Sequence, residues 1–264
     1  MFKRLLILPK PVENTFFLWG PRQTGKTSLL KQMYPDAQLI DLLISEERIR
    51  YLQDPGLLRK ELIAKKQKQG LVVIDEVQKV PDLLNEVHWL IENSNYKFCL
   101  CGSSVRKLKR VGANLLGGRA IRYELSGLSW AELEKEFTLE RILNHGYLPR
   151  HYQSTNPDKL IRSYIADYLT EEVAKEGLVR NLPKFADFLR SAALTDSEIV
   201  NYKNIAEDCN VSSPTVKDYF QILVNTLLGK YLPAYVKRQK RKVLSAPKFY
   251  MSDVAIVNQL AKKG

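Results

Sequence analysis

Short apolar runs alternate with amphipathic stretches over the first half of the chain. The apolar runs predict five strands, at residues 15–19, 38–42, 71–75, 98–101 and 120–125. The stretches between them repeat apolar residues with helical spacing and predict helices at 26–34, 55–68, 81–92 and 104–116. Strands that alternate with helices are typical of an α/β fold with a parallel sheet covered on both faces. The continuous apolar character of the strands fits that burial.

The pattern changes after residue 128, where helical spacing replaces the strands. Ser129 and Glu132 have the Ser-x-x-Glu spacing of a helix-capping box. Helical spacing then continues to about Leu194, with breaks at Gly146 and Pro149 and near Gly177. We therefore expect a second, mainly helical part of the chain.

Residues 205–220 predict two helices joined by a short turn, with Ser213 as the cap of the second helix. Two strands, at 231–236 and 242–244, are expected to follow as a hairpin with a basic tip. Together these elements would form a winged helix, a module that binds either DNA or another protein. If it binds double-stranded DNA, the second helix enters the major groove and the tip contacts phosphates. The candidate DNA contacts are Lys217, Lys237, Arg238, Lys240, Arg241 and Lys242.

Composition narrows the class of protein. The chain has 264 residues, 45% of them hydrophobic, which excludes a wholly disordered chain. No apolar run approaches the roughly 18 residues of a membrane span, so no membrane partner is expected. There are 41 Lys and Arg residues against 29 Asp and Glu residues, a net charge of +12. This excess indicates either an anionic partner, such as nucleic acid or nucleotide, or an ordinary lysine-rich surface.

The three cysteines form no disulfide framework, which favours a reducing, cytoplasmic location. Cys99 and Cys101 share one face of the fourth predicted strand, and we interpret them as core residues. The three histidines (His88, His145 and His151) form no metal-ligand spacing with them, so no zinc site is expected.

A glycine-rich segment directly after the first predicted strand and directly before a helix matches the P-loop pattern G-x-x-x-x-G-K-[ST]. Its glycines let backbone N–H groups face a phosphate, and the helix N-terminus adds its dipole. Lys26 is expected to reach the β- and γ-phosphates of ATP, and the Thr27 hydroxyl is placed to bind Mg²⁺. The predicted nucleotide-binding residues are Gly20, Pro21, Arg22, Gln23, Thr24, Gly25, Lys26, Thr27 and Ser28.

Two acids follow the third predicted strand. Asp75 is expected to hold Mg²⁺ through water, and Glu76 to polarise the attacking water as general base. The paired acids indicate ATP hydrolysis, since the sequence contains no Asn-Lys-x-Asp segment of the kind that reads guanine.

Two further residues are candidates for the same chemistry. Ser103 follows the fourth predicted strand, where its hydroxyl could bind the γ-phosphate or the attacking water, or could cap the next helix. Arg119 precedes the fifth predicted strand. It could act as an arginine finger in the site of a neighbouring subunit, or it could be an ordinary surface arginine.

With these residues in place, the chain resembles prokaryotic AAA+ ATPases whose AAA domain is followed by a C-terminal domain of unknown function. Four segments carry the resemblance, which is best over residues 10–150: GPRQTGKTSLL, VVIDEVQKVPDLL, CGSSVRKLKR with NLLGGRA, and GYLPR. The resemblance implies the strand order 5-1-4-3-2 and an α-helical lid. It also implies a sensor role for Ser103 and a finger role for Arg119. No sensor arginine is evident in the lid, where Arg150 is the nearest candidate.

We therefore expect an AAA+ nucleotide-binding domain at residues 1–127, a helical lid at 128–183 and a winged-helix domain at 184–264. Relatives of this kind continue into a further, nuclease-like α/β region, so the chain is expected to be a short or truncated form. The expected function is hydrolysis of Mg·ATP to move the lid and the winged helix, with DNA and other copies of the chain as candidate partners. The alternative is a nucleotide-gated binding protein with little turnover.

Overall fold

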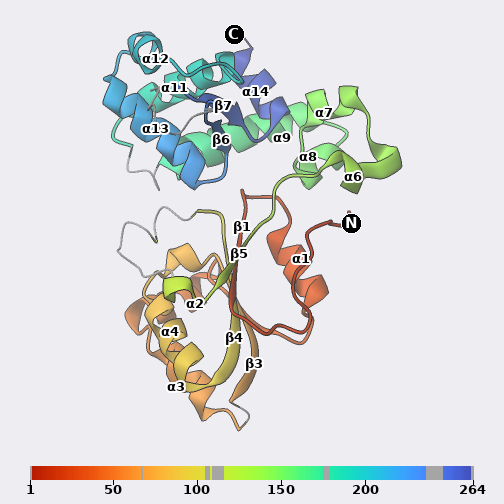
Figure 1. The fold of residues 1–264 in the computed structure, drawn as a ribbon, viewed down its shortest axis with the longest axis vertical. Coiled ribbons are helices and arrows are strands. Elements are labelled where there is room, and N and C mark those ends of the chain that lie inside the picture. Colours follow the sequence, from red (N-terminus) through yellow and green to blue (C-terminus); the bar gives the residue numbers. More distant parts are fainter. Residues whose placement is uncertain are drawn as a thin grey trace. The chain divides into compact units, whose positions relative to one another are not determined.

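The computed structural model describes residues 2–66, 68–104, 108, 116–174, 179–235 and 246–262. The chain divides into two units, Lys3–Ser126 and Gly127–Gly264, and Phe2 groups with the second of them. Figure 1 shows the sheet of the first unit and the mainly helical second unit. Each unit is described by itself.

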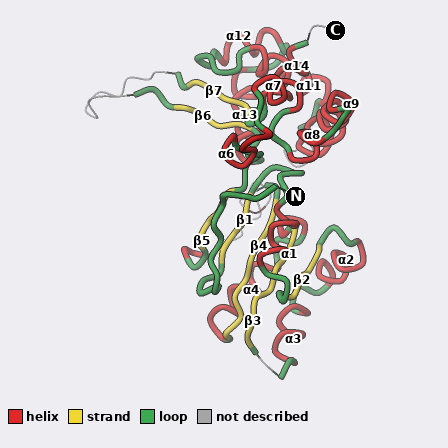
Figure 2. The backbone as a smooth tube through the Cα atoms, turned by 90° about the vertical axis from the view of Figure 1, so that its right-hand side faces the viewer, coloured by secondary structure: helices red, strands yellow, loops and turns green. Residues whose placement is uncertain are grey.

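A five-stranded parallel sheet forms the centre of the first unit, as Figure 2 shows. Its strands are β1 (Phe16–Trp19), β2 (Gln38–Asp41), β3 (Gln69–Asp75), β4 (Asn95–Gly102) and β5 (Ile121–Glu124). Their order across the sheet is β2-β3-β4-β1-β5, which confirms the predicted order. All four residues of β1 are buried, because this apolar strand lies between two neighbours and is covered on both faces.

Helices connect these strands. They are α1 (Lys26–Met33), α2 (Ser45–Gln53), α3 (Leu57–Ala64), η1 (Val77–Lys79), α4 (Leu83–Asn93) and η2 (Leu116–Gly118). The sequence did not predict α2, since Tyr51 is its only buried residue and its apolar spacing is correspondingly weak. The helix predicted at 104–116 lies largely outside the described residues.

The register of the sheet determines where the candidate site residues lie. Trp19, the last residue of β1, pairs with Gly102 at the end of β4. Asp41, the last residue of β2, pairs with Asp75 at the end of β3. Because all strands are parallel, the segments that follow β1, β3 and β4 meet at the same edge of the sheet.

The second unit consists mainly of helices. They are α6 (Trp130–Leu133), η3 (Glu134–Glu136), α7 (Leu139–His145), α8 (Pro149–Gln153), α9 (Pro157–Ser163), the π-helix η4 (Tyr164–Val173), α11 (Leu182–Leu194), α12 (Tyr202–Asp208), α13 (Ser213–Asn225) and α14 (Val254–Ala261). The predicted capping box is present at the start of α6: the Ser129 hydroxyl accepts from the Glu132 N–H, and the Glu132 carboxylate accepts from the Ser129 N–H.

One continuous hydrophobic cluster runs from Leu148 to Leu260 through the second unit. Phe188 and Phe220 pack edge to face near its centre, with ring centroids 4.9 Å apart. The cluster draws residues from the predicted lid and from the predicted winged-helix domain alike. The boundary that we placed between residues 183 and 184 stays a prediction.

Helices α12 and α13 form the expected helix–turn–helix arrangement, with one correction. Ser212, and not Ser213, is the cap of α13, because the Ser212 hydroxyl accepts from the Thr215 N–H at 3.3 Å.

Two antiparallel strands follow, β6 (Gly229–Leu232) and β7 (Lys248–Met251). The partner of β6 is therefore β7, and the strand predicted at 242–244 lies outside the described residues. Phe249 of β7 packs against Tyr231 and Phe220, with ring centroids 5.2 and 4.7 Å away, and these contacts select the pairing.

Candidate nucleotide site

The loop between β1 and α1 has the backbone that the P-loop pattern requires. Gln23 and Gly25 both have left-handed backbone angles, with φ of 65° and 89°. A side chain at Gly20 would place its Cβ 2.2 Å from the carbonyl oxygen of Leu125, so only glycine fits there. Pro21 and Arg22 lie in the same loop, and Ser28 in the first turn of α1.

Lys26 is the first residue of α1, and its side chain turns back into the loop. Its ammonium group donates hydrogen bonds to the carbonyl oxygens of Gly20 and Pro21, at 2.7 and 2.9 Å. Only 6% of Lys26 is exposed. A buried positive charge beside the N-terminus of a helix fits a polyphosphate.

Thr27 and Asp75 join the loop to the end of β3. The Thr27 hydroxyl donates to Asp75 Oδ2 at 2.5 Å, while Asp75 Oδ1 accepts from the Glu76 N–H at 3.0 Å. A hydroxyl and a carboxylate are oxygen ligands of the kind that Mg²⁺ prefers. These two side chains therefore fit a magnesium ion at the predicted place.

Glu76 is the N-cap residue of the turn η1 and has a left-handed backbone conformation, with φ 56° and ψ 42°. Its carboxylate accepts hydrogen bonds from the Gln78 amide and, at 3.3 Å, from the Ser103 hydroxyl. Glu76 and Ser103 are 6% and 1% exposed, so the general-base candidate and the sensor candidate lie together in a nearly dry site. The structure thus brings both predicted residues to the end of β3.

Sequence reasoning missed two residues of this neighbourhood. Gln78 lies two positions after Glu76, and that proximity to the acid pair was the available signal. Arg4 donates to the carbonyl oxygens of Thr24 and Ser126, each at 2.6 Å, and so ties the P-loop to the end of the unit. Nothing in the local sequence around Arg4 indicates this contact.

Residues 12–134 match the family model described as "AAA domain". The first unit of this chain is an AAA domain. AAA domains are P-loop ATPase domains, so the match supports an ATPase-type role for this chain. Residues 136–264 match a second model, a domain of unknown function (DUF8612).

Two curated relatives are 25% identical to the chain over 249 residues: the uncharacterized proteins Rv2008c of Mycobacterium tuberculosis and Mb2031c of Mycobacterium bovis. The matches cover 92% of this chain and 55% of each relative, so the chain spans about half the length of the curated relatives it matches.

Two solved structures also match the chain weakly. One is the Orc1 protein of Aeropyrum pernix in complex with DNA, at TM-score 0.35 and 11% identity, covering 94% of this chain and 86% of that one. The other is a STAND protein with a tetratricopeptide repeat sensor from Pyrococcus horikoshii, at TM-score 0.32 and 14% identity, covering 99% and 43%. At these TM-scores, neither similarity indicates a function for this chain.

Arg119 lies away from the nucleotide site of its own AAA domain. Ile121, the first residue of β5, pairs with Phe16, the first residue of β1, whereas the P-loop follows the last residue of β1. The Arg119 guanidinium forms an ion pair with Glu92 of α4 and its side chain is 43% exposed. A finger role in a neighbouring AAA domain stays a prediction.

Lys217 is the one candidate DNA contact that the structure describes. It lies exposed on α13, with its ammonium nitrogen 5.3 Å from the centre of the Tyr202 ring. The remaining candidates lie outside the described residues, and they are Lys237, Arg238, Lys240, Arg241 and Lys242.

Cys99 and Cys101 are fully buried in β4, which confirms their assignment to the core. Burial raises the pKa of both thiols well above the ordinary value. Among the residues that the structure describes, no three His, Cys, Asp or Glu side chains gather as metal ligands would. Within the same part of the chain, none of the helices combines the length and the apolar character that a membrane crossing needs.

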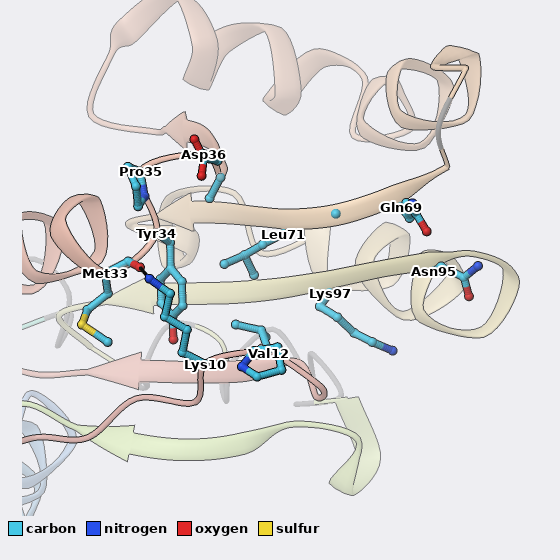
Figure 3. Close-up of a pocket in the computed structure, with 13 residues that line it drawn as sticks. Lys10, Val12, Met33, Tyr34, Pro35, Asp36, Gln69, Leu71, Asn95 and Lys97 are labelled. Carbon is cyan, nitrogen blue, oxygen red and sulfur yellow. Dashed lines mark hydrogen bonds between the residues drawn. The ribbon is translucent and has the colours of Figure 1, made fainter.

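A cavity of about 600 Å³ lies at the other end of the sheet of the AAA domain, by the starts of β3 and β4. Figure 3 shows Leu71 and Tyr34 on its wall and Lys10 and Lys97 beside it. None of its described lining residues belongs to the P-loop or to the acid pair. The cavity is therefore separate from the nucleotide site.

Proposed function

We propose that this chain hydrolyses Mg·ATP at the nucleotide site of its AAA domain, with Glu76 as general base. The observation that carries the proposal is the 2.5 Å hydrogen bond from Thr27 to Asp75, which joins the P-loop to the acid pair. Lys26 directly precedes Thr27 in the sequence, and Glu76 directly follows Asp75. The candidate phosphate-binding group, the candidate magnesium-binding pair and the candidate base thus lie within one largely buried site.

Each residue has a role that its surroundings support. The Lys26 ammonium and the N-terminus of α1 would offset the negative charge of the phosphates. Thr27 and Asp75 would hold Mg²⁺, which when bound supplies further positive charge at the phosphate oxygens. Glu76 would take the proton of the attacking water, and Ser103 would donate a hydrogen bond to the γ-phosphate.

Steady-state phosphate release from ATP tests the proposal. Glu76→Gln is the sharpest variant, because the amide keeps the size of the carboxylate and cannot act as a base. We expect it to bind a fluorescent ATP analogue as the wild type does, while turnover falls by about 100-fold or more. Lys26→Ala is expected to lose binding as well.

Two results would contradict the proposal. Turnover in Glu76→Gln equal to that of the wild type would remove Glu76 as the base. Tight nucleotide binding by the wild type with no turnover would favour the nucleotide-gated binding protein instead.

Within this proposal, residues 128–183 form a lid and residues 184–264 a winged-helix module, both of which respond to the state of the nucleotide. A change in the protease sensitivity of the second unit, measured with ADP and with the non-hydrolysing Glu76→Gln variant bound to ATP, tests this coupling. An identical cleavage pattern in both states would contradict it.

A second candidate function is binding of double-stranded DNA through α13. The observation that favours it is the spacing of Lys217, Gln221 and Asn225, which are four residues apart and share one helix face. The Gln221 amide donates to the Asn225 side chain at 3.2 Å, which orients both polar groups. Such side chains can donate hydrogen bonds to bases and phosphates in the major groove.

The dependence of DNA affinity on salt tests this second function. We expect Lys217→Ala to lower the slope of log affinity against log salt by about one unit, because one phosphate contact is lost. Lys203→Ala on the neighbouring helix is the matched control, since Lys203 already pairs with Glu207 at 4.0 Å. If the slope of log affinity against log salt is the same in Lys217→Ala and Lys203→Ala, a phosphate contact by Lys217 of α13 is excluded.

A further inference from the structure

Gln78 completes a closed ring of hydrogen bonds beside the nucleotide site. Its amide nitrogen donates to Glu76 Oε2 and, at 3.0 Å, to the Ser103 hydroxyl oxygen. The Ser103 hydroxyl in turn donates to the same carboxylate oxygen at 3.3 Å. Only 1% of Gln78 is exposed, so the ring is shielded from water. Each of the three side chains thus restrains the other two.

The chemistry of the ring determines which way the Gln78 amide faces. An ionised carboxylate only accepts hydrogen bonds, so the amide nitrogen must face Glu76. The opposite atom, Gln78 Oε1, is then buried without a hydrogen-bond donor among the described residues. An unpartnered buried carbonyl is uncommon in proteins. Gln78 therefore leaves its carbonyl oxygen without a hydrogen-bond donor among the described residues, while its amide nitrogen binds the carboxylate of Glu76.

The absence of a side chain at Gly102, the last residue of β4, leaves space for the Gln78 amide. A side chain at Gly102 would place its Cβ 2.3 Å from Gln78 Oε1 and 2.7 Å from the ring of Trp19. Glycine at the end of β4 thus allows the Gln78 amide to lie between η1 and the strand. The ring depends on elements that are 25 residues apart in the sequence.

We propose that Gln78 is a positioning residue for ATP hydrolysis, whose amide holds the Glu76 carboxylate in place and links it to Ser103. This inference rests on the proposed function of the site. Ser103 has a single hydroxyl proton, which it can donate to Glu76 or to a phosphate oxygen but not to both. When Ser103 donates to the γ-phosphate of ATP, Gln78 remains as the donor that keeps Glu76 Oε2 in position. Gln78 thereby links recognition of the γ-phosphate to the state of the base.

The substitution Gln78→Leu tests this role, because leucine fills similar space and donates no hydrogen bond. We expect kcat to fall by about 10- to 100-fold, as for partners that orient a reacting group, while the dissociation constant for a fluorescent ATP analogue changes less than about threefold. A fall in kcat at nearly unchanged nucleotide affinity is what we expect when a group that orients the base is lost. A merely structural role would instead lower nucleotide affinity and kcat together.

The matched control is Gln53→Leu, at the exposed end of α2, which should leave kcat and the dissociation constant unchanged. If Gln78→Leu has the same kcat and dissociation constant as Gln53→Leu, the proposed role of Gln78 is overturned, whereas the proposed ATPase function is not. Absence of turnover in the wild type would instead overturn the proposed function together with this inference.

A second variant covers the case in which Gln78→Leu does not fold, as judged by circular dichroism and nucleotide binding. Gln78→Glu keeps the shape of the side chain and places a second carboxylate against Glu76. The two like charges repel each other and displace the Glu76 carboxylate, so kcat should fall by about 10-fold or more while the dissociation constant for the ATP analogue changes less than about threefold. A wild-type kcat in Gln78→Glu would overturn the proposal.

Discussion

Asp253 lies buried in the second unit and joins two segments that are far apart in the sequence. Its carboxylate accepts hydrogen bonds from the backbone N–H groups of Tyr147, Ala255 and Ile256, at 2.8, 2.9 and 3.4 Å. It therefore caps α14 and ties that helix to the turn after α7. Burial raises the pKa of Asp253 from 3.8 to about 6, because the loss of water outweighs these hydrogen bonds, which lower the pKa.

This shift makes the stability of the second unit depend on pH. Below pH 3.8 the carboxyl group is protonated in the folded and in the unfolded chain. Between pH 3.8 and about 6 the folded state keeps a proton that the unfolded state has lost, so the free energy of unfolding decreases as pH rises through this window. From pH 4 to pH 7 the loss amounts to about 2 kcal/mol.

Urea unfolding followed by circular dichroism at several pH values measures this contribution. The comparison is between the wild type and Asp253→Asn, whose side chain does not titrate, so that the contributions of other groups cancel. We expect the free energy of unfolding of the wild type, minus that of the variant, to fall by about 2 kcal/mol between pH 4 and pH 7. A separate transition of the first unit, where one is resolved, serves as an internal control.

Two outcomes would refute the reasoning about Asp253. A difference that stays constant with pH would mean that its pKa is not shifted by folding. A difference that rises with pH would mean that the backbone hydrogen bonds outweigh burial, and that the pKa is lowered.

Four further variants test other parts of the structure. Gly20→Ala should destabilise the AAA domain by about 1–3 kcal/mol in urea unfolding, since the new Cβ meets the carbonyl oxygen of Leu125 at 2.2 Å; unchanged stability would contradict this contact. Arg119→Ala should change stability by less than about 1 kcal/mol, because its ion pair is exposed. If Arg119 acts in a neighbouring subunit, its loss should lower ATPase activity only at protein concentrations where the chain self-associates. Ser212→Ala should lower the free energy of unfolding by about 1 kcal/mol through loss of the cap of α13, and Ser213→Ala by less.

Most of the first unit could be predicted from the sequence because its signals are local. Strands β1, β3 and β4 contain continuous apolar runs, and the sheet buries these runs. The edge strands β2 and β5 mix apolar and polar residues and are more exposed. The P-loop pattern depends on consecutive residues, so Lys26 and Thr27 could be assigned before any fold was known. Helix α2 escaped prediction because Ile49 and Leu52 are about half exposed, which weakens the apolar spacing that reveals a surface helix.

The second unit shows where local signals mislead. The capping box at Ser129 was found because its two partners are three residues apart. The partner strand of β6 was assigned to the nearest β-prone segment, whereas the contact of Phe249 with the core selects a strand further along the chain.

The sequence by itself determined the fold class, the strand order through its family resemblance, and the residues of the P-loop pattern. Only the tertiary structure decided which distant side chains meet. Gln78 contacts Ser103 across 25 positions, and Asp253 contacts Tyr147 across 106. Such contacts leave no periodic pattern in the sequence, because they depend on how strands and helices pack and not on the spacing of residues within one element.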